Sequence, residues 1–234
     1  MKMENLRFRF LGSEREDAVW GRPAKVLLGC HYDTKLYDEF EFVGANDGGS
    51  GCGLLMEMAS VLAAKYPQLA REVELVFFDG EEAIGEDIIY PTTAGFDRQN
   101  AYDGLYGSHY YARQLRMKPR TQWPQAVVIV DMIGDRNLNI EIPANCNERL
   151  IDLALKSANE VGAGKFVGRS RSGVTDDHVP FHLLGIPVVN FIDFDFEPWH
   201  TEGDVLSTIS SESLEVSGAV VVRFLQNFLL QGSQ

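Results

Sequence analysis

Cysteine is scarce in this 234-residue chain, which contains only Cys30, Cys52 and Cys146. No two of them form a CxxC pair. Three cysteines are too few for a disulfide scaffold or for a zinc site made of four thiolates. Any metal site in this protein must therefore be built from carboxylates and imidazoles.

Long apolar runs are also missing. No run approaches the roughly 20 residues that a helix needs to cross a bilayer, and the opening residues, MKMENL, lack the apolar stretch of a secretory signal. We therefore expect no membrane partner. The compartment stays open between a periplasmic or secreted location and the cytoplasm.

Positive charge is in short supply as well. Lysine and arginine number 21 against 34 aspartates and glutamates, which gives a net charge of −13. Nucleic acids and anionic membranes bind basic surface stripes, and none is visible here, so neither partner is expected. The acidity fits a cationic ligand, such as a metal ion or a protonated peptide amine, although it would also serve solubility alone.

The remaining composition, 45% hydrophobic and 24% charged, is that of a globular protein. Short apolar runs alternate with helical patterns, which predicts a single α/β domain over residues 1–234, with a mostly parallel central sheet flanked by helices. The predicted strands are Arg7–Leu11, Ala24–Gly29, Glu72–Phe78, Ala126–Val130 and Pro187–Ile192. The predicted helices are Gly51–Lys65, Gly107–Arg116, Asn147–Val161 and Glu212–Leu230.

A long polar segment, Ile84–Tyr106, contains prolines and glycines and lies between two of these elements. Loops of this length inside a compact domain are often functional. We expect this one to form part of a substrate-binding rim.

Residues of the types that bind metals follow the carboxyl ends of the predicted strands. Parallel α/β sheets bind ligands beyond this edge. The residues concerned are His31, Asp33, Glu81, Glu82, Asp131 and His200, joined by Asp47 in the loop before the first long helix. Two imidazoles and several carboxylates at one edge suit one or two zinc ions.

Each residue also has a purely structural interpretation. Asp47 would be a good cap for the helix that follows it. Glu81 and Glu82 would be ordinary solvated carboxylates if they lay on the surface. A single histidine such as His31 or His200 is more often structural than a ligand, so the metal hypothesis rests on the joint pattern.

Six motifs in consistent order resemble the M28 family of zinc aminopeptidases, and most closely its glutaminyl cyclase branch (glutaminyl-peptide cyclotransferases). They run from about Lys25 to the C-terminus. The motifs are Cys30-His31-Tyr32-Asp33, Phe42-Val43-Gly44-Ala45, Phe77–Ala83, Leu105-Tyr106-Gly107-Ser108, Asp176–Phe181 and Trp199-His200-Thr201.

This resemblance implies roles for the clustered residues. Asp47, Glu82 and His200 would hold one zinc, and in a dinuclear aminopeptidase His31 and Asp131 would hold a second ion bridged by Asp47. Asp33 would orient His31 from behind. Glu81 would be the general acid and base. In a cyclase, Asp176 and Asp131 would surround the reacting nitrogen, and Trp199 would line the substrate pocket.

Two reactions fit these residues. A cyclase with one zinc would convert an N-terminal glutamine to pyroglutamate and release ammonia, while an aminopeptidase with two would hydrolyse the N-terminal residue of a peptide. Trp199 and the Asp176-Asp177-His178 run favour the cyclase. A third interpretation, a catalytically silent module that binds peptides, is disfavoured because the ligands and Glu81 are all present. Self-association into a homo-oligomer is left open.

Cys30 and Cys52 stand where the animal secretory cyclases of this resemblance carry a disulfide. The resemblance therefore implies that the two side chains are close in space. As thiols they would equally serve as small core residues.

Overall fold

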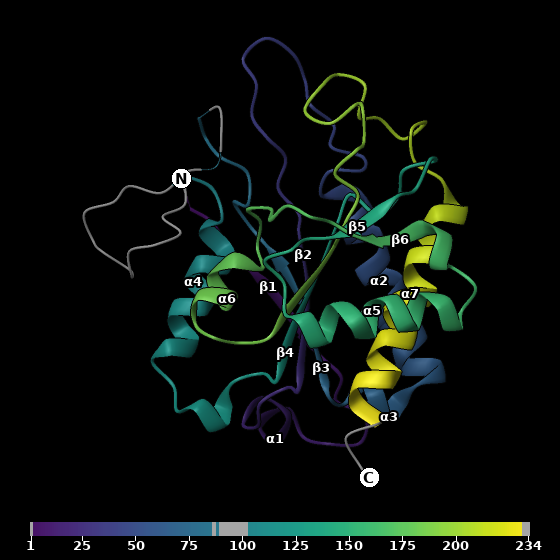
Figure 1. The fold of residues 1–234 in the computed structure, drawn as a ribbon. Helices are drawn as coiled ribbons and strands as arrows, with labels where there is room; N and C mark the ends of the chain where they lie inside the picture. Colours follow the sequence, from purple (N-terminus) through teal and green to yellow (C-terminus); the bar gives the residue numbers. More distant parts are fainter. Residues whose placement is uncertain (1, 86–87, 89–102, 231–234) are drawn as a thin grey trace.

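Five strands form the central sheet, in the order β1-β3-β2-β4-β7. The computed structural model describes residues 2–85, 88 and 103–230. The strands are β1 Leu6–Arg9, β2 Val26–His31, β3 Val73–Phe78, β4 Ala126–Asp131 and β7 Val188–Ile192. Strands β2, β3, β4 and β7 run parallel, and β1 pairs antiparallel with β3. The prediction of a mostly parallel sheet in an α/β fold is confirmed (Figure 1).

The four parallel strands are continuous apolar runs because both faces of the sheet are covered. Every residue of β2, β3, β4 and β7 is buried, whereas the first three residues of β1 are exposed. Strand β7 is the last strand of this sheet and is nevertheless buried. There the chain folds back, and the Asn147 amide donates a hydrogen bond to the Val188 carbonyl.

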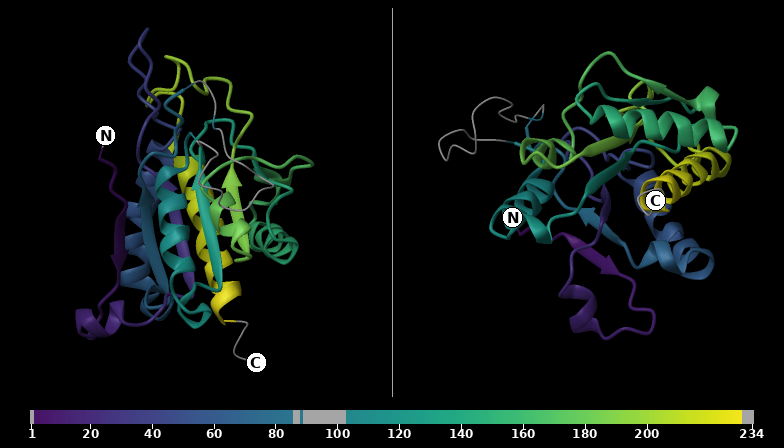
Figure 2. Two further views of the ribbon diagram at one scale, coloured as in Figure 1. Left: turned by 90° about the vertical axis from the view of Figure 1, so that its left-hand side faces the viewer. Right: turned by 60° about the horizontal axis from the view of Figure 1, so that its bottom comes forward.

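Helices cover the two faces unequally (Figures 1 and 2). Successive strand residues point to opposite faces, so Leu28 packs beneath Leu55 and Phe224, whereas Leu27 packs with Tyr111 and Phe181. The first face carries α2 Gly49–Lys65, α3 Pro67–Ala70, α5 Glu148–Glu160 and α7 Ser211–Leu230. The second carries α4 Tyr106–Arg116 and α6 Val179–Leu183.

The predicted elements all exist, with boundaries shifted by at most two residues. Asn147 lies outside α5 and caps it, because its side chain accepts a hydrogen bond from the Leu150 amide. The additional elements are short: helix α1 Glu16–Trp20, helices α3 and α6, the 3₁₀ turns Arg120–Gln122 and Gly164–Phe166, and a two-stranded parallel sheet of β5 Ile140–Ile142 and β6 Val167–Arg169. Elements this short show no periodicity in sequence.

Helix α7 is 20 residues long with a mean hydropathy of 1.2, which matches a membrane span by length and composition. It packs on the first face of the sheet, where Val221, Phe224 and Leu225 are buried among core residues. Its apolar character is therefore explained by packing within the domain.

The carboxyl ends of the parallel strands meet at one end of the molecule. The loops that follow β2 and β7 both rise from this end, at the top of Figure 1. Helix α1 and the connections that enter β2 and β4 lie at the opposite end. Of the predicted rim segment Ile84–Tyr106, residues 86–87 and 89–102 lie outside the described residues.

The core on the first face gives a direct test of packing on helix α2. Leu55 is fully buried, while its neighbour Met56 is 67% exposed. Leu55→Ala should lower the free energy of unfolding by about 2–5 kcal/mol, because a cavity replaces the lost methyl groups. Met56→Ala, the matched control, should change it by about 0.5 kcal/mol or less. Denaturant unfolding measures both, and equal effects would contradict this packing.

Candidate metal centre

His31 and Asp131 are the last residues of the neighbouring parallel strands β2 and β4. The shared register brings their side chains together, with His31 Nε2 3.2 Å from Asp131 Oδ1. His31 is 1% and Asp131 7% exposed, so both polar groups lie at the end of the core.

Asp47 reaches the same point from the turn before α2. Its Oδ1 lies 3.1 Å from His31 Nε2. Gly48 follows in a left-handed conformation (φ 81°), and a side chain there would lie 3.0 Å from the His31 ring. Gly51 allows α2 to approach the sheet, because its Cβ would meet that of Cys30 at 2.8 Å. No side chain caps α2, so the capping interpretation of Asp47 is wrong.

Asp204 holds Asp47 in place. This fully buried carboxylate accepts hydrogen bonds from the backbone amides of Asn46 at 2.7 Å and Asp47 at 3.0 Å. The sequence analysis missed it, because an aspartate in a Glu-Gly-Asp loop looks like an ordinary turn residue. Asn46 extends the support, since its side-chain oxygen accepts from the Gly134 amide at 2.9 Å.

Glu82 and His200 complete the cluster from loops after β3 and β7. His200 Nε2 lies 3.3 Å from Glu82 Oε2 and 3.4 Å from Asp47 Oδ2. His200 has a left-handed backbone (φ 57°), which is unfavourable for a side chain of this size and aims its ring into the cluster. The Trp199 ring stacks on that of His200, with centroids 4.1 Å apart.

Two overlapping donor sets result, His31–Asp47–Asp131 and Asp47–Glu82–His200. The donor atoms of each set lie within 4.8 Å of one another. Asp47 Oδ2 and Glu82 Oε1 are buried without a hydrogen-bond partner in the described part of the chain. Buried carboxylate oxygens need a cation or donors, and nitrogen and oxygen donors from histidine and carboxylates suit zinc. The residues present therefore fit this metal.

Asp33 braces the cluster from behind in two ways. Its carboxylate accepts hydrogen bonds from the backbone amides of Glu81 and Glu82, both at 3.1 Å. His31 Nδ1 lies 3.1 Å from the backbone oxygen of Asp33, closer than the 3.7 Å to its carboxylate. Asp33 thus fixes the Glu81–Glu82 turn with its side chain and the His31 ring mainly with its carbonyl.

Lys35 supports the same turn and was also missed by the sequence analysis. Its ammonium group donates to the carbonyls of Ala83 at 3.1 Å and Gly85 at 2.9 Å, and the residue is 5% exposed. A lysine in a polar loop gives no sign in sequence that it will be buried. Here it is a cation beside a group of carboxylates.

Glu81 lies beside the donor sets but belongs to neither. It is 6% exposed, which excludes a solvated surface position for it and for Glu82, which is equally buried. Burial raises the pKa of Glu81 well above its usual value, and the nearby carboxylates of Asp176 and Glu82 add to the effect against the opposing influence of His31. A group with a raised pKa is suited to exchange protons near neutral pH.

Asp176 is fully enclosed near Glu81. Burial, with the Asp131 carboxylate, raises its pKa to about 7. The Asn190 side-chain amide donates to Asp176 Oδ2 at 2.5 Å, and the Asp177 backbone amide donates to Oδ1. Asn190 comes from β7 and was not singled out in the sequence, since a polar residue inside an apolar strand can have many causes.

A cavity of about 490 Å³ opens over these groups. Asp47, Glu81, Glu82, Asp131, Asp176 and His200 all line it. Phe194 and Trp199, whose ring centroids are 4.9 Å apart, contribute an aromatic wall. The volume falls within the range of pockets that enclose small ligands. All the predicted site residues except Asp33 and His31 therefore line one cavity.

The sulfur atoms of Cys30 and Cys52 are 3.8 Å apart, so the expected proximity is confirmed. Both are free thiols in this structure. The Cys52 thiol donates to the His31 carbonyl at 3.2 Å, which ties helix α2 to the end of β2.

Comparison with known proteins agrees with this site. The model of peptidase family M28 matches residues 15–225. The chain belongs to peptidase family M28. A curated relative, glutaminyl-peptide cyclotransferase of Dictyostelium discoideum, is 27% identical over 89% of this chain and 61% of its own length. The chain thus spans about three fifths of that relative.

Solved structures agree with the M28 assignment. The glutaminyl cyclase of an Acidobacteriales bacterium is 32% identical and superposes with a TM-score of 0.79, over 98% of this chain and 74% of its own. A leucine aminopeptidase precursor from Bacteroides thetaiotaomicron, 21% identical, superposes with a TM-score of 0.71 over 97% of this chain and 83% of its own, and shares the fold.

Asp204→Asn tests the support beneath Asp47. An amide in place of the carboxylate weakens the two backbone hydrogen bonds and loosens Asp47, so zinc affinity should fall about 10–100-fold. Exposed Glu202→Gln is the matched control and should leave affinity unchanged. Competition titration with a zinc-binding dye measures both. Unchanged affinity in Asp204→Asn would show that Asp47 is positioned by other contacts.

His178 gives a pH test of the buried network. Burial lowers its pKa to about 3, and the nearby His182 adds to this, so the folded state disfavours the charged imidazole. Its stabilising effect is full above its unfolded pKa of 6.5 and is lost as the pH falls toward 3. Between pH 7 and pH 5 this group should account for a loss of about 2 kcal/mol in unfolding free energy.

His178→Asn should remove that part of the pH dependence, while His182→Asn, on the exposed side of α6, should retain it. Denaturant unfolding at the two pH values measures the difference. If wild type and His178→Asn lose the same unfolding free energy between pH 7 and pH 5, the result would contradict a neutral buried imidazole.

Proposed function

We propose that this protein converts N-terminal glutamine of peptides to pyroglutamate with release of ammonia, using one zinc ion bound by Asp47, Glu82 and His200. The observation that carries the proposal is the buried, unliganded Glu81 beside this donor set, at the base of a cavity with an aromatic wall. The 32% identity to a glutaminyl cyclase supports the same reaction.

The donor set that contains His200 has the stronger need for a cation. Among the carboxylate oxygens of the two donor sets, those buried without a hydrogen-bond partner are Asp47 Oδ2 and Glu82 Oε1, and both belong to this set. In the set that contains His31, both ring nitrogens already have hydrogen-bond partners. Nδ1 lies next to the Asp33 carbonyl oxygen and Nε2 next to the Asp131 carboxylate. The imidazolium form of His31 would supply the positive charge that a second zinc would otherwise bring.

The His31 environment favours that charged form. Burial acts to lower its pKa, but Asp131, Asp33 and Asp47 outweigh burial and raise the pKa well above the usual value. A charged His31 compensates Asp131 and one oxygen of Asp47.

Zinc at this site would supply a Lewis acid for the γ-carboxamide oxygen of the substrate glutamine. Glu81 takes a proton from the substrate α-amino group, whose nitrogen forms a bond to the carbonyl carbon (Cδ) of the γ-carboxamide. The carbon–nitrogen bond to the carboxamide nitrogen then breaks, and Glu81 returns the proton so that ammonia leaves. The attacking amine and its target belong to one residue, so positioning supplies much of the acceleration.

The surrounding residues hold the substrate nitrogen. Asp176 and Asp131 are buried carboxyl groups on the same cavity wall as Glu81. They would accept hydrogen bonds from the ammonium and amide groups of the substrate. Trp199, 37% exposed and stacked on His200, would cover the glutamine side chain.

A second candidate function, hydrolysis of N-terminal residues, is favoured by the His31–Asp47–Asp131 set itself. The Asp33 carbonyl next to Nδ1 would keep a proton on that nitrogen and leave Nε2 free for a second zinc bridged by Asp47. Glu81 would then deprotonate a water molecule, and the same cavity would bind the peptide.

Glu81→Gln tests the shared chemistry. The substitution keeps shape and removes the base, so turnover should fall at least about 100-fold while the zinc content stays at the wild-type value. Exposed Glu57→Gln on α2 is the control and should retain full activity. A fully active Glu81→Gln protein would remove Glu81 from its role.

The two functions are separated by substrate and by metal content. Zinc-loaded protein is incubated with a glutaminyl peptide and with leucyl p-nitroanilide, and bound zinc is measured by mass spectrometry. Ammonia and a pyroglutamyl product with one zinc per chain support the cyclase. Nitroaniline with two zinc ions overturns it in favour of the aminopeptidase, and no turnover of either substrate overturns both in favour of a silent module.

A further inference from the structure

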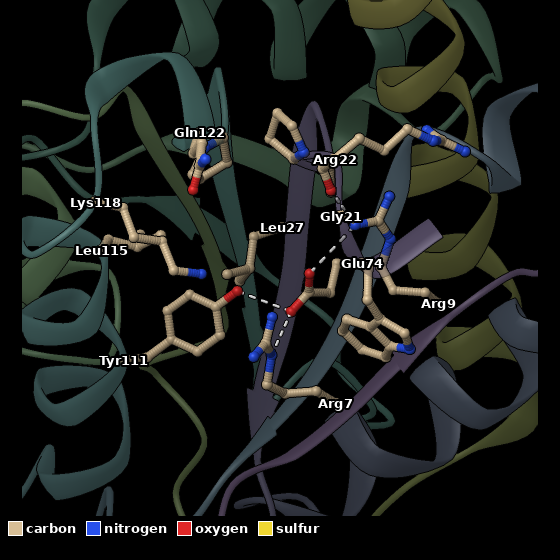
Figure 3. A pocket seen from close by; sticks show the side chains of 14 residues that line it. Arg7, Arg9, Gly21, Arg22, Leu27, Glu74, Tyr111, Leu115, Lys118 and Gln122 are labelled. Carbon is tan, nitrogen blue, oxygen red and sulfur yellow. Dashed lines mark hydrogen bonds and ion pairs between the residues drawn. The ribbon is translucent and has the colours of Figure 1, made fainter. Parts of the chain in front are cut away.

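A small hollow of about 50 Å³ lies at the opposite end of the sheet from the metal centre. It is enclosed by β1, the chain between α1 and β2, and the connection from α4 to β4. Figure 3 shows Arg9 and Arg22 on one side of it, Lys118 and Gln122 on the other, and Glu74 between them.

Glu74 is a buried carboxylate whose charge is already matched. Arg7 Nε donates to its Oε1 at 2.6 Å, and the Tyr111 hydroxyl donates to the same oxygen at 2.8 Å. Arg9 Nη1 lies farther away, 3.7 Å from the other oxygen. Glu74 and Arg7 therefore form a neutral pair, and Glu74 is 4% exposed.

Arg9 is the unusual group. Its side chain is 2% exposed. Nη1 donates to the Arg22 carbonyl at 3.1 Å, but buried Nε and Nη2 have no hydrogen-bond partner in the described chain. The centroid of the Trp20 ring lies 6.0 Å from the guanidinium carbon, a cation–π contact that offsets part of the charge. The ring does not replace the missing hydrogen-bond acceptors. Burying donors of a charged group unpaired is costly.

The remaining charges around the hollow leave an excess of positive charge. Arg22 and Arg71 share one carboxylate, Glu14, at 3.0 and 2.8 Å. Lys118 has no ion pair among the described residues, and Figure 3 shows its amino group on the side of the hollow facing Glu74 and Arg9. Arg7, Arg9 and Lys118 thus bring three positive charges to a small hollow that is lined by one carboxylate, Glu74, in a chain with a net charge of −13.

We propose that this hollow binds a small doubly charged oxyanion of the phosphate or sulfate type, held by Arg9 and Lys118 with Gln122 at the rim. Tetrahedral oxyanions accept several hydrogen bonds at once, and a guanidinium group can donate two parallel ones to such an anion. A water molecule needs about 10–15 Å³ of such space, so the hollow has room for an anion that displaces a few waters.

Binding here would act on stability rather than on the chemistry. Arg9 ends β1, Ala24 precedes β2 and Pro124 precedes β4, so an anion would tie together three segments at the amino edge of the sheet. The metal centre lies at the carboxyl edge of the same strands. Turnover by the zinc-loaded enzyme should therefore not depend on occupancy.

Thermal unfolding of the zinc-loaded chain tests the proposal, with sulfate as the probe. Sodium sulfate replaces sodium chloride up to low millimolar levels at constant ionic strength. A ligand that binds only the folded state raises Tm, and above its dissociation constant the rise grows with the logarithm of its concentration. Near ten times the dissociation constant the rise should be about 3–5 °C. Acetate, with one charge, should give less than half of this shift.

Lys118→Met should lose at least half of the sulfate-dependent shift and keep its basal activity, because Lys118 is exposed and its removal leaves the fold intact. Lys156→Met, an exposed lysine on α5, is the matched control and should keep the whole shift. The absence of a rise in Tm at low millimolar sulfate would mean that the hollow holds water only. Equal shifts in all three proteins, or an acetate shift as large as that of sulfate, would also overturn the proposal.

Discussion

The buried carboxylate of Asp47, placed between two imidazoles, is the constraint on which the site depends. One oxygen lies 3.1 Å from His31 and the other 3.4 Å from His200, although these histidines end segments far apart in the chain. So many carboxylates at one buried point repel one another unless a cation joins them. These side chains therefore form a candidate metal centre at this edge, and the sheet serves to bring them together.

Several residues contribute to the site by holding Asp47 in position. Gly48 and Gly51 let the turn and helix α2 pass close to β2, and Asp204 binds the Asn46 and Asp47 amides. The left-handed backbone at His200 stores strain in the same loop. The residues around the site thus hold the ligand side chains in position at some cost in stability, as expected for a preorganised site.

Much of the fold and of the candidate site could be predicted from the sequence, because both depend on patterns that are visible in it. The apolar runs of β2, β3, β4 and β7 specified a parallel sheet, and the ligand types after them specified which edge binds the metal. Asp204, Lys35 and Asn190 could not be found in this way. Their importance comes from burial and from partners that no local pattern reveals: Lys35 and Asp204 bind backbone groups more than forty residues away, and Asn190 binds the Asp176 side chain. For Asp47 the sequence left two interpretations, a zinc ligand and a helix cap, and the structure excludes the cap because Gly48 occupies that position.

The central claim is that side chains from three loops bind one cation. Anomalous diffraction at the zinc absorption edge from crystals of the zinc-loaded protein tests it most directly. The account predicts one strong peak about 2.0–2.2 Å from atoms of Asp47, Glu82 and His200, with Glu81 near it and not bound. A peak elsewhere, or none at this cluster in a fully loaded crystal, would contradict it.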